Sequence, residues 1–168
     1  MTAASIKQLV WASTLLAALS TGLMAGVFFA FSTFVMRALA RLPVPQGIEA
    51  MQSINLTAIN PVFMAVLFGS TAVCLLLAVY SLVSWPQQAA FYLLLGSVLY
   101  LVGCFLTTAL FNVPLNNALA RVDPGSMDGA RLWARYLTSW PAWNHVRTLS
   151  SILASAAYAF ALSHFSKQ

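Results

Sequence analysis

The chain has 168 residues, of which 61% are hydrophobic and only 7% are charged, and its mean hydropathy is +0.84. A soluble domain usually carries about 25% charged residues, so the composition excludes an ordinary soluble protein. The length fits a single membrane domain, residues 1–168, without a separate soluble module. The net charge of +5 does not indicate nucleic-acid binding, because the basic residues flank apolar stretches, where charge mainly sets membrane orientation.

Long uncharged stretches follow one another along the chain. Residues 9–34 and 56–120 contain no Asp, Glu, Lys or Arg, the second stretch has a break at Trp85–Gln88, and residues 148–165 form the last stretch. A helix needs about 20 apolar residues to cross roughly 30 Å of hydrocarbon. We therefore predict an all-α, four-transmembrane-helix bundle with spans near residues 8–36, 61–84, 88–116 and 141–165.

The two halves of the chain resemble each other at a constant offset. Phe34–Leu42 aligns with Pro114–Val122, since both contain Ala-Leu-Ala-Arg, and the same offset places Pro61 on Pro141. Proline is favoured in the first turn of a helix, so each proline is predicted to begin one, with Asn60 as N-cap of the first. The pattern predicts two parallel two-helix repeats, residues 8–85 and 88–165. A chance match in a chain rich in Ala and Leu is the alternative.

The basic residues are distributed unevenly between the two sides of such a bundle. The polar linkers, residues 36–60 and 113–147, contain Arg37, Arg41, Arg121, Arg131, Arg135 and Arg147, whereas the opposite side has only Lys7 and Lys167. Because Lys and Arg are enriched in cytoplasmic loops, we expect the linkers in the cytoplasm and both termini outside. The expected location is a bacterial inner membrane, with the lipid bilayer as surroundings.

Several patterns have packing as their simplest explanation. Gly22 and Gly26 form a small-xxx-small motif, which lets helices approach closely and is also a face through which a homo-oligomer could form. Cys74 and Cys104 lie inside predicted spans without ligand spacing, so we expect no disulfide or metal site. Two histidines on one helix, 145 and 164, lie about 28 Å apart and cannot share a metal.

Polar side chains gather where the third predicted helix ends and the fourth begins. Asn112 and Asn116 are four residues apart and share one helical face, and Pro114 between them frees a backbone carbonyl. In the fourth helix, Trp140, Asn144 and Arg147 share a face. This face continues as a polar stripe of Thr148, Ser151 and Ser155.

This cluster fits a pocket for a planar aromatic or quinone-like molecule. Arginine pairs with an oxyanion, amides donate hydrogen bonds, and tryptophan stacks on a flat ring. The alternative is structural, with the amides and Arg147 capping helix ends and joining the repeats.

Short stretches around these residues resemble the DUF1772, or anthrone oxygenase-like, family of small membrane proteins. They are Gly26–Ser32, Val35–Leu39, Asn60–Phe63, Phe111–Asn116 and Trp133–Arg147. The resemblance implies a four-helix membrane bundle and, for characterised relatives, oxidation of an anthrone to an anthraquinone by O₂ without a recognised flavin, haem or nicotinamide. We therefore expect no cofactor. Where the family usually has proline after Val-Met, this chain has Arg37, which places a charge near the expected site.

The expected roles combine this resemblance with the residue chemistry. Arg147 and Asn144 would stabilise an oxyanion, and His145 is the general-base candidate because its ordinary pKa lies near neutrality. The expected substrate-binding residues are Asn112, Asn116, Trp140, Trp143, Asn60 and Arg37. The competing class is a non-enzyme, either a small-molecule binding or transport bundle or an accessory subunit of a larger membrane protein. Broken helices with ion ligands at the membrane midplane would favour transport.

Overall fold

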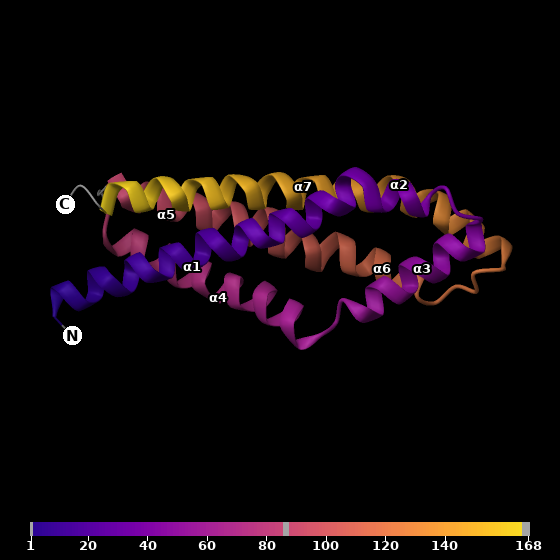
Figure 1. Ribbon diagram of the computed structural model, residues 1–168, viewed down its shortest axis with the longest axis horizontal. Coiled ribbons are helices and arrows are strands. Elements are labelled where there is room, and N and C mark those ends of the chain that lie inside the picture. Colours follow the sequence, from indigo (N-terminus) through magenta and orange to yellow (C-terminus); the bar gives the residue numbers. More distant parts are fainter. Residues whose placement is uncertain (1, 86–87, 166–168) are drawn as a thin grey trace.

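A computed structural model describes residues 2–85 and 88–165, and all regular structure within them is helical (Figure 1). The helices are α1 Ala3–Ala30, the π-helical η1 Phe31–Val35, α2 Met36–Leu39, α3 Val44–Thr57, α4 Pro61–Val83, α5 Gln88–Val98, the π-helical η2 Leu99–Leu106 and η3 Thr108–Asn112, α6 Val113–Leu119 and α7 Met127–Phe165.

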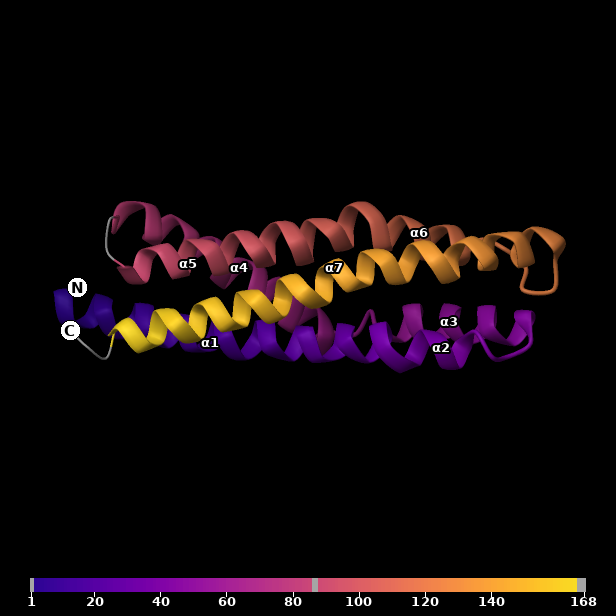
Figure 2. The same ribbon diagram turned by 90° about the horizontal axis from the view of Figure 1, so that it is seen from above.

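Within residues 2–85 and 88–165, four continuous helical segments are long and apolar enough to cross a membrane. They are Ala4–Leu39, Pro61–Val83, Gln88–Leu119 and Met127–Phe165. Both termini lie at one end of the molecule, and the α2–α3 and α6–α7 connections lie at the other (Figures 1 and 2). The four-span helical bundle is thus confirmed, and the chain is a multi-pass membrane protein.

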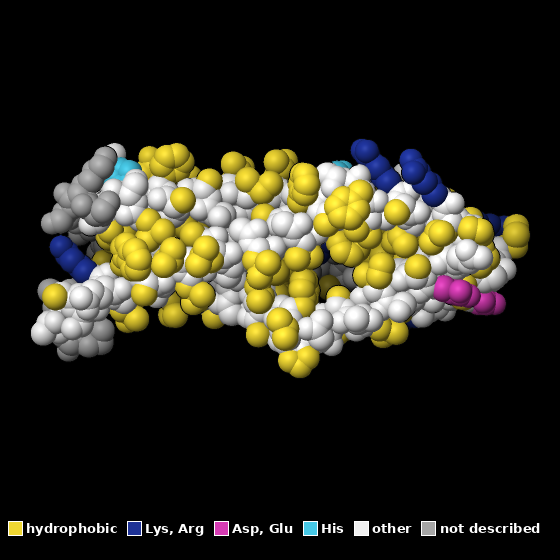
Figure 3. Space-filling view, viewed as in Figure 1, with side chains coloured by type: hydrophobic (Ala, Val, Ile, Leu, Met, Phe, Trp, Pro, Cys, Tyr) yellow, Lys and Arg dark blue, Asp and Glu magenta, His cyan; other side chains and the backbone are white. Residues whose placement is uncertain are grey.

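The surface matches this assignment. Apolar side chains cover the middle of the visible face, and charged side chains gather at the two ends (Figure 3). Large hydrophobic residues point outward from the spans, among them Leu19 at 65% exposure and Leu76 at 69%. Such exposure would be costly in water and is expected of a surface that faces lipid.

The second span begins as the sequence predicts. Asn60 is the N-cap of α4, and its side-chain oxygen accepts a hydrogen bond from the Phe63 N–H at 3.0 Å. The Asn60 amide group also donates to the Thr57 carbonyl at 3.0 Å, which ties the end of α3 to the start of α4. Pro61 follows in the first turn, where its missing N–H costs nothing.

The prediction that Pro141 begins the fourth helix is wrong. α7 starts at Met127 and runs for 39 residues with Pro141 inside it. A proline there removes one helical hydrogen bond, but the segment before it is held in place because Trp133, Tyr136 and Trp140 are buried. At 1.5 Å per residue α7 is about 58 Å long, roughly twice the hydrocarbon thickness. α7 is therefore longer than a span requires, and its charged residues, Asp128, Arg131, Arg135 and Arg147, lie in or at the end of its first half.

The predicted linkers are correspondingly more ordered than expected. Region 36–60 contains α2 and α3, and region 113–147 contains α6 and the first half of α7. Pro61 and Pro141 thus occupy different local structures. The duplication of the two halves stays a prediction.

The buried apolar residues form two cores along the bundle. The terminus-side core comprises Val10, Ala17, Met24, Phe28, Leu67, Cys74, Leu77, Leu93, Tyr100, Cys104, Ala154, Tyr158 and Ala161. The linker-side core comprises Met36, Leu39, Ile48, Met51, Leu119, Trp133, Tyr136 and Trp140. The candidate site lies where the two cores meet.

Gly22 is used for packing within the chain. A Cβ at this position would lie 3.1 Å from the Ser155 hydroxyl oxygen, and that hydroxyl donates to the Ala18 carbonyl at 2.8 Å. α1 therefore approaches α7 closely, as a small-residue motif predicts. A Cβ at Gly26 would meet nothing within 4 Å. A homo-oligomer through this face stays a prediction.

Candidate functional site

The cluster is built around Arg147, which is 5% exposed on α7. Its Nη2 donates to the Asn144 side-chain oxygen at 2.6 Å, and its Nη1 donates to the Thr108 hydroxyl at 3.4 Å. The guanidinium carbon lies 4.2 Å from the centre of the Phe28 ring and 5.1 Å from that of Trp140. The Nε hydrogen has no partner. Two aromatic rings and two acceptors thus fix the cation, and of its three nitrogens only Nε has no partner.

Asn144 connects Arg147 to the first span. Its amide nitrogen donates to the Phe28 carbonyl and to the Ser32 hydroxyl, both at 2.7 Å. The Ser32 and Thr148 hydroxyls are 3.0 Å apart. The Phe28 carbonyl also accepts from the Phe31 N–H at the end of α1, so the Asn144 amide adds a second hydrogen bond to it. Asn144 is therefore held rigidly beside the cation.

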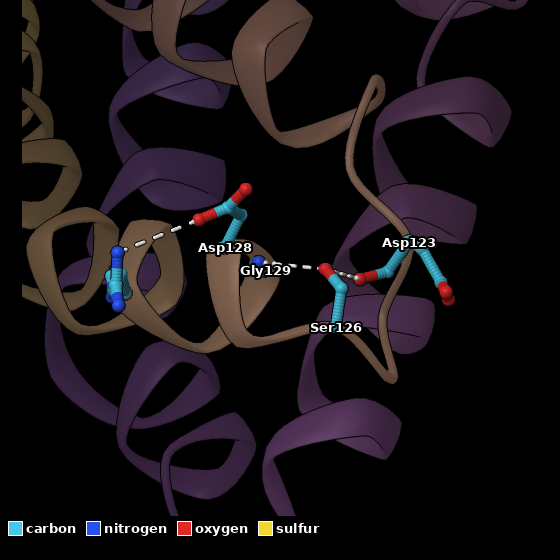
Figure 4. Close-up of polar contacts among 5 residues, drawn as sticks. Asp123, Ser126, Asp128 and Gly129 are labelled. Carbon is cyan, nitrogen blue, oxygen red and sulfur yellow. Dashed lines mark hydrogen bonds and ion pairs between the residues drawn. The ribbon is translucent and has the colours of Figure 1, made fainter.

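Arg147 has no carboxylate partner in the part of the chain that the structure describes. Asp128 pairs with Arg131 at 3.7 Å, and both side chains are largely exposed (Figure 4). Asp123 lies in the turn before α7, where its carboxylate accepts from the Gly125 N–H at 3.0 Å and its carbonyl from the Ser126 hydroxyl at 2.7 Å. The carboxylates of Asp123 and Asp128 therefore make their contacts around the start of α7, and neither one neutralises the charge of the buried Arg147.

The two predicted asparagines face α7 together. Asn112, 1% exposed, donates from its amide nitrogen to the Trp140 carbonyl at 3.3 Å, and its side-chain oxygen has no partner. The Asn116 oxygen accepts from the Tyr136 hydroxyl and from the Trp140 indole N–H, each at 2.8 Å. Asn116 thereby fixes the indole ring that covers Arg147. The predicted shared face of the two amides is present.

Four other candidate residues lie elsewhere. His145 is exposed, on a different face of α7 from the buried Asn144. Trp143 stacks on Phe111 with ring centres 3.7 Å apart. Two further candidates, Asn60 and Arg37, are exposed, the first as the cap of α4 and the second on α2. The structure therefore concentrates the polar contacts on Arg147, Asn144, Asn112, Asn116 and Trp140.

Some participants carried no clear sequence signal. Phe28 contributes its ring and its backbone carbonyl, and Thr108 contributes a hydroxyl from η3. Each π-helical segment of the described residues supplies a residue at or near the cluster: Ser32 from η1, Cys104 near Arg147 from η2, and Thr108 and Asn112 from η3. π-helical turns recur at functional sites, but apolar periodicity in a membrane span does not reveal them.

Two hollows in the surface lie away from the cluster. One of about 350 Å³ is lined by Lys7, Gln8, Trp11 and Phe165 near the termini. Another of about 260 Å³ lies between α1 and α7 and is lined by Gly22, Ala25, Gly26, Phe29, Ile152 and Ser155. An enclosed pocket at Arg147 stays a prediction.

Comparison with known proteins gives one match. The family model described as anthrone oxygenase matches residues 61–157, which is more than half of the chain and includes every residue of the cluster except Phe28 and Ser32. No curated protein and no solved structure matches the chain.

Proposed function

The chain belongs to the anthrone oxygenase family, and from this premise we propose that it binds a planar aromatic ligand with an ionised oxygen and oxidises it with O₂. The observation that carries the proposal is the buried Arg147, which has a free Nε donor and no carboxylate partner among the described residues. A buried charge costs several kcal/mol unless it is compensated. Inside a membrane span, such a residue is by default a functional one.

The surroundings of Arg147 suit an aromatic enolate. Phe28 and Trp140 present ring faces to the guanidinium, so a third flat ring can be held by the same apolar surroundings. The unpartnered Nε donates to the ligand oxyanion, and the unpartnered Asn112 oxygen accepts from a neighbouring hydroxyl of the ligand. Asn144 and Thr108 hold the guanidinium in position beside the enolate oxygen.

The proposed reaction is balanced without an additional reductant. Loss of a proton from the C–H next to the two rings of an anthrone gives an enolate, whose oxygen faces Arg147. The same carbon then bonds to O₂ and gives a peroxide anion, which takes up a proton from solvent, equal in number to the one lost at the start, and becomes a hydroperoxide. Loss of water from the hydroperoxide leaves the second carbonyl of the anthraquinone, so O₂ is the oxidant and supplies the new oxygen. Because His145 is exposed, we assign it no role, and the ligand enters the site as its enolate.

The test is oxygen consumption by the purified protein in detergent. With anthrone as substrate, O₂ uptake and anthraquinone absorbance should exceed those of a protein-free control. Arg147→Ala should slow turnover by raising its activation free energy by about 1.5–3 kcal/mol, as expected for loss of a charge-assisted hydrogen bond. Arg147→Lys should recover part of this loss, because lysine lacks the planar fork.

Arg135→Ala, on the exposed side of the same helix, is the matched control and should behave as wild type. Size-exclusion chromatography reports how much of each variant is folded. Oxidation at the protein-free rate, or equal turnover by folded Arg147→Ala, would contradict the proposal. Saturable binding of the ligand without O₂ uptake would indicate a binding protein.

We further propose that the α2–α3 and α6–α7 connections face the cytoplasm of a bacterial inner membrane. The support is the gathering of exposed arginines at this end, since cytoplasmic loops are enriched in basic residues. Single cysteines at Ser5 and Asn117, both exposed, test the orientation. A membrane-impermeant maleimide should label the first and not the second in intact cells. The reverse pattern would invert the assignment.

A further inference from the structure

Two buried hydroxyls of the terminus-side core have no hydrogen-bond partner. Tyr100 on η2 and Ser151 on α7 are both 0% exposed, and neither side-chain oxygen makes a hydrogen bond of normal geometry; the Cys104 thiol lies near both, and the Ser70 hydroxyl lies near Tyr100. A buried polar group left unpaired costs about 1–3 kcal/mol, and in a bilayer no bulk water is available to compensate it. Such a pair is therefore evidence for an oxygen or nitrogen that does not belong to the protein.

Neighbouring hydroxyls show that this is not the general state of the core. Tyr158 pairs with Ser97 at 3.0 Å, and Thr148 donates back to the Asn144 carbonyl of its own helix at 2.8 Å. Ser155, on the same helix, donates to the Ala18 carbonyl of α1 at 2.8 Å. Ser151 makes neither type of bond.

The two hydroxyls lie close to the proposed ligand. Ser151 is four residues after Arg147, on the same face of α7, which corresponds to a rise of about 6 Å along the helix. The fully buried Cys104 thiol lies beside both Ser151 and Tyr100. A fifth unpartnered atom, the Asn55 amide nitrogen, lies on α3; the other four mark two ends of one region, with Arg147 Nε and the Asn112 oxygen toward the linkers and the two hydroxyls toward the termini.

We propose that Tyr100 and Ser151 bind a second, uncharged oxygen at the far end of the planar ligand whose ionised oxygen meets Arg147. This rests on the proposed function and deepens it, because it defines the ligand as a fused-ring compound with oxygens at opposite ends. A serine and a tyrosine hydroxyl can each donate or accept, so either a hydroxyl or a carbonyl of the ligand satisfies them.

The probes are 2-naphthol, 2,6-dihydroxynaphthalene and 2,3-dihydroxynaphthalene, titrated by calorimetry into the full-length protein in detergent. Wild type should bind the 2,6-isomer about three- to tenfold more tightly than 2-naphthol, as expected for one or two neutral hydrogen bonds and above the twofold statistical advantage of a symmetric ligand. The 2,3-isomer, whose oxygens are adjacent, should show no such gain.

Tyr100→Phe and Ser151→Ala should each reduce the preference for the 2,6-isomer, and together they should abolish it while leaving the affinity for 2-naphthol unchanged. Tyr158→Phe and Ser155→Ala are the matched controls, because these hydroxyls already have protein partners, and both variants should keep the preference.

Equal binding of 2-naphthol and the 2,6-isomer by wild type, or a preference that survives the double variant, would overturn the second-oxygen assignment alone. Arg147→Gln separates the two proposals, because it should lower the affinity for all three probes. If 2-naphthol fails to bind, or binds equally to Arg147→Gln, the proposed function fails and this inference fails with it.

Discussion

Two parts of the bundle treat buried polar groups differently: the Tyr158–Ser97 pair within the terminus-side core, and the Arg147 cluster where the two cores meet. In the terminus-side core, Tyr158 and Ser97 satisfy each other, and Gly96 lets the Tyr158 ring approach the neighbouring helix. At the edge of the linker-side core, Asn116 serves two aromatic donors and Arg147 keeps a free donor. The first arrangement is closed and the second is incomplete. Polar groups that stabilise a bundle form complete pairs, whereas polar groups that bind a ligand have donors or acceptors without a partner in the protein.

The largest expected effect is on the linker-side core. Asn116→Leu removes the one acceptor shared by the Tyr136 hydroxyl and the Trp140 indole N–H, both of which are largely buried. Two unpaired donors should lower the free energy of unfolding by about 2–4 kcal/mol. Thermal denaturation in detergent measures the loss. Asn117→Leu, at an exposed position, is the control, and an equal loss in both would show that Asn116 has no special part in fixing the indole.

The next effect tests close packing in the terminus-side core. A Cβ at Gly96 would lie 3.0 Å from the Tyr158 ring and 3.2 Å from the Ala154 carbonyl oxygen. Gly96→Val should therefore destabilise the fold by about 1–3 kcal/mol through overpacking. Gly69→Val is the matched control, because a Cβ there meets nothing within 4 Å. Thermal midpoints should fall for the first variant only, and ligand affinity of the folded fraction should stay at the wild-type value.

The third prediction concerns a variant that adds an anion next to Arg147. Thr108 lies 3.4 Å from Arg147 Nη1, so Thr108→Asp places a carboxylate next to the buried cation. The Thr108→Asp protein should fold normally but bind a naphtholate anion at least tenfold more weakly than wild type. The new carboxylate competes with the ligand for Arg147. Thr108→Asn, similar in size but neutral, should bind within about twofold of wild type. Unchanged affinity in folded Thr108→Asp would argue against an anion site at Arg147.

The smallest effect concerns the closed polar pair. Ser97→Ala removes the oxygen partner of the buried Tyr158 hydroxyl and leaves it beside only the weaker Cys74 thiol, and should cost about 1–2 kcal/mol of stability. Adding Tyr158→Phe removes both partners and should recover most of that loss. Thermal unfolding of the two single variants and the double variant gives the coupling energy. Additive losses would mean that the pair contributes only through packing.

The sequence by itself determined the class of fold. Apolar length and scarce charge are strong constraints, because unpaired backbone and charged groups are costly in lipid, so four spans follow from composition alone. Asn60 and Pro61 also determined the start of α4, since capping depends on residues a few positions apart. The helical spacing of Trp140, Asn144 and Arg147, and of Asn112 and Asn116, was enough to place each set on one face; all are buried except Asn116, which is partly buried.

Only the tertiary structure decided what happens at Pro141 and which partners complete the cluster. The same proline signal begins one helix and lies inside another, because the buried aromatic residues before Pro141 stabilise a helical segment that local propensity does not favour. Ser32 and Thr148 meet across 116 positions of sequence, and Phe28 contributes through a carbonyl that every residue possesses. Contacts of this kind depend on how the spans are rotated and aligned against each other, which the apolar pattern of any single span leaves undetermined.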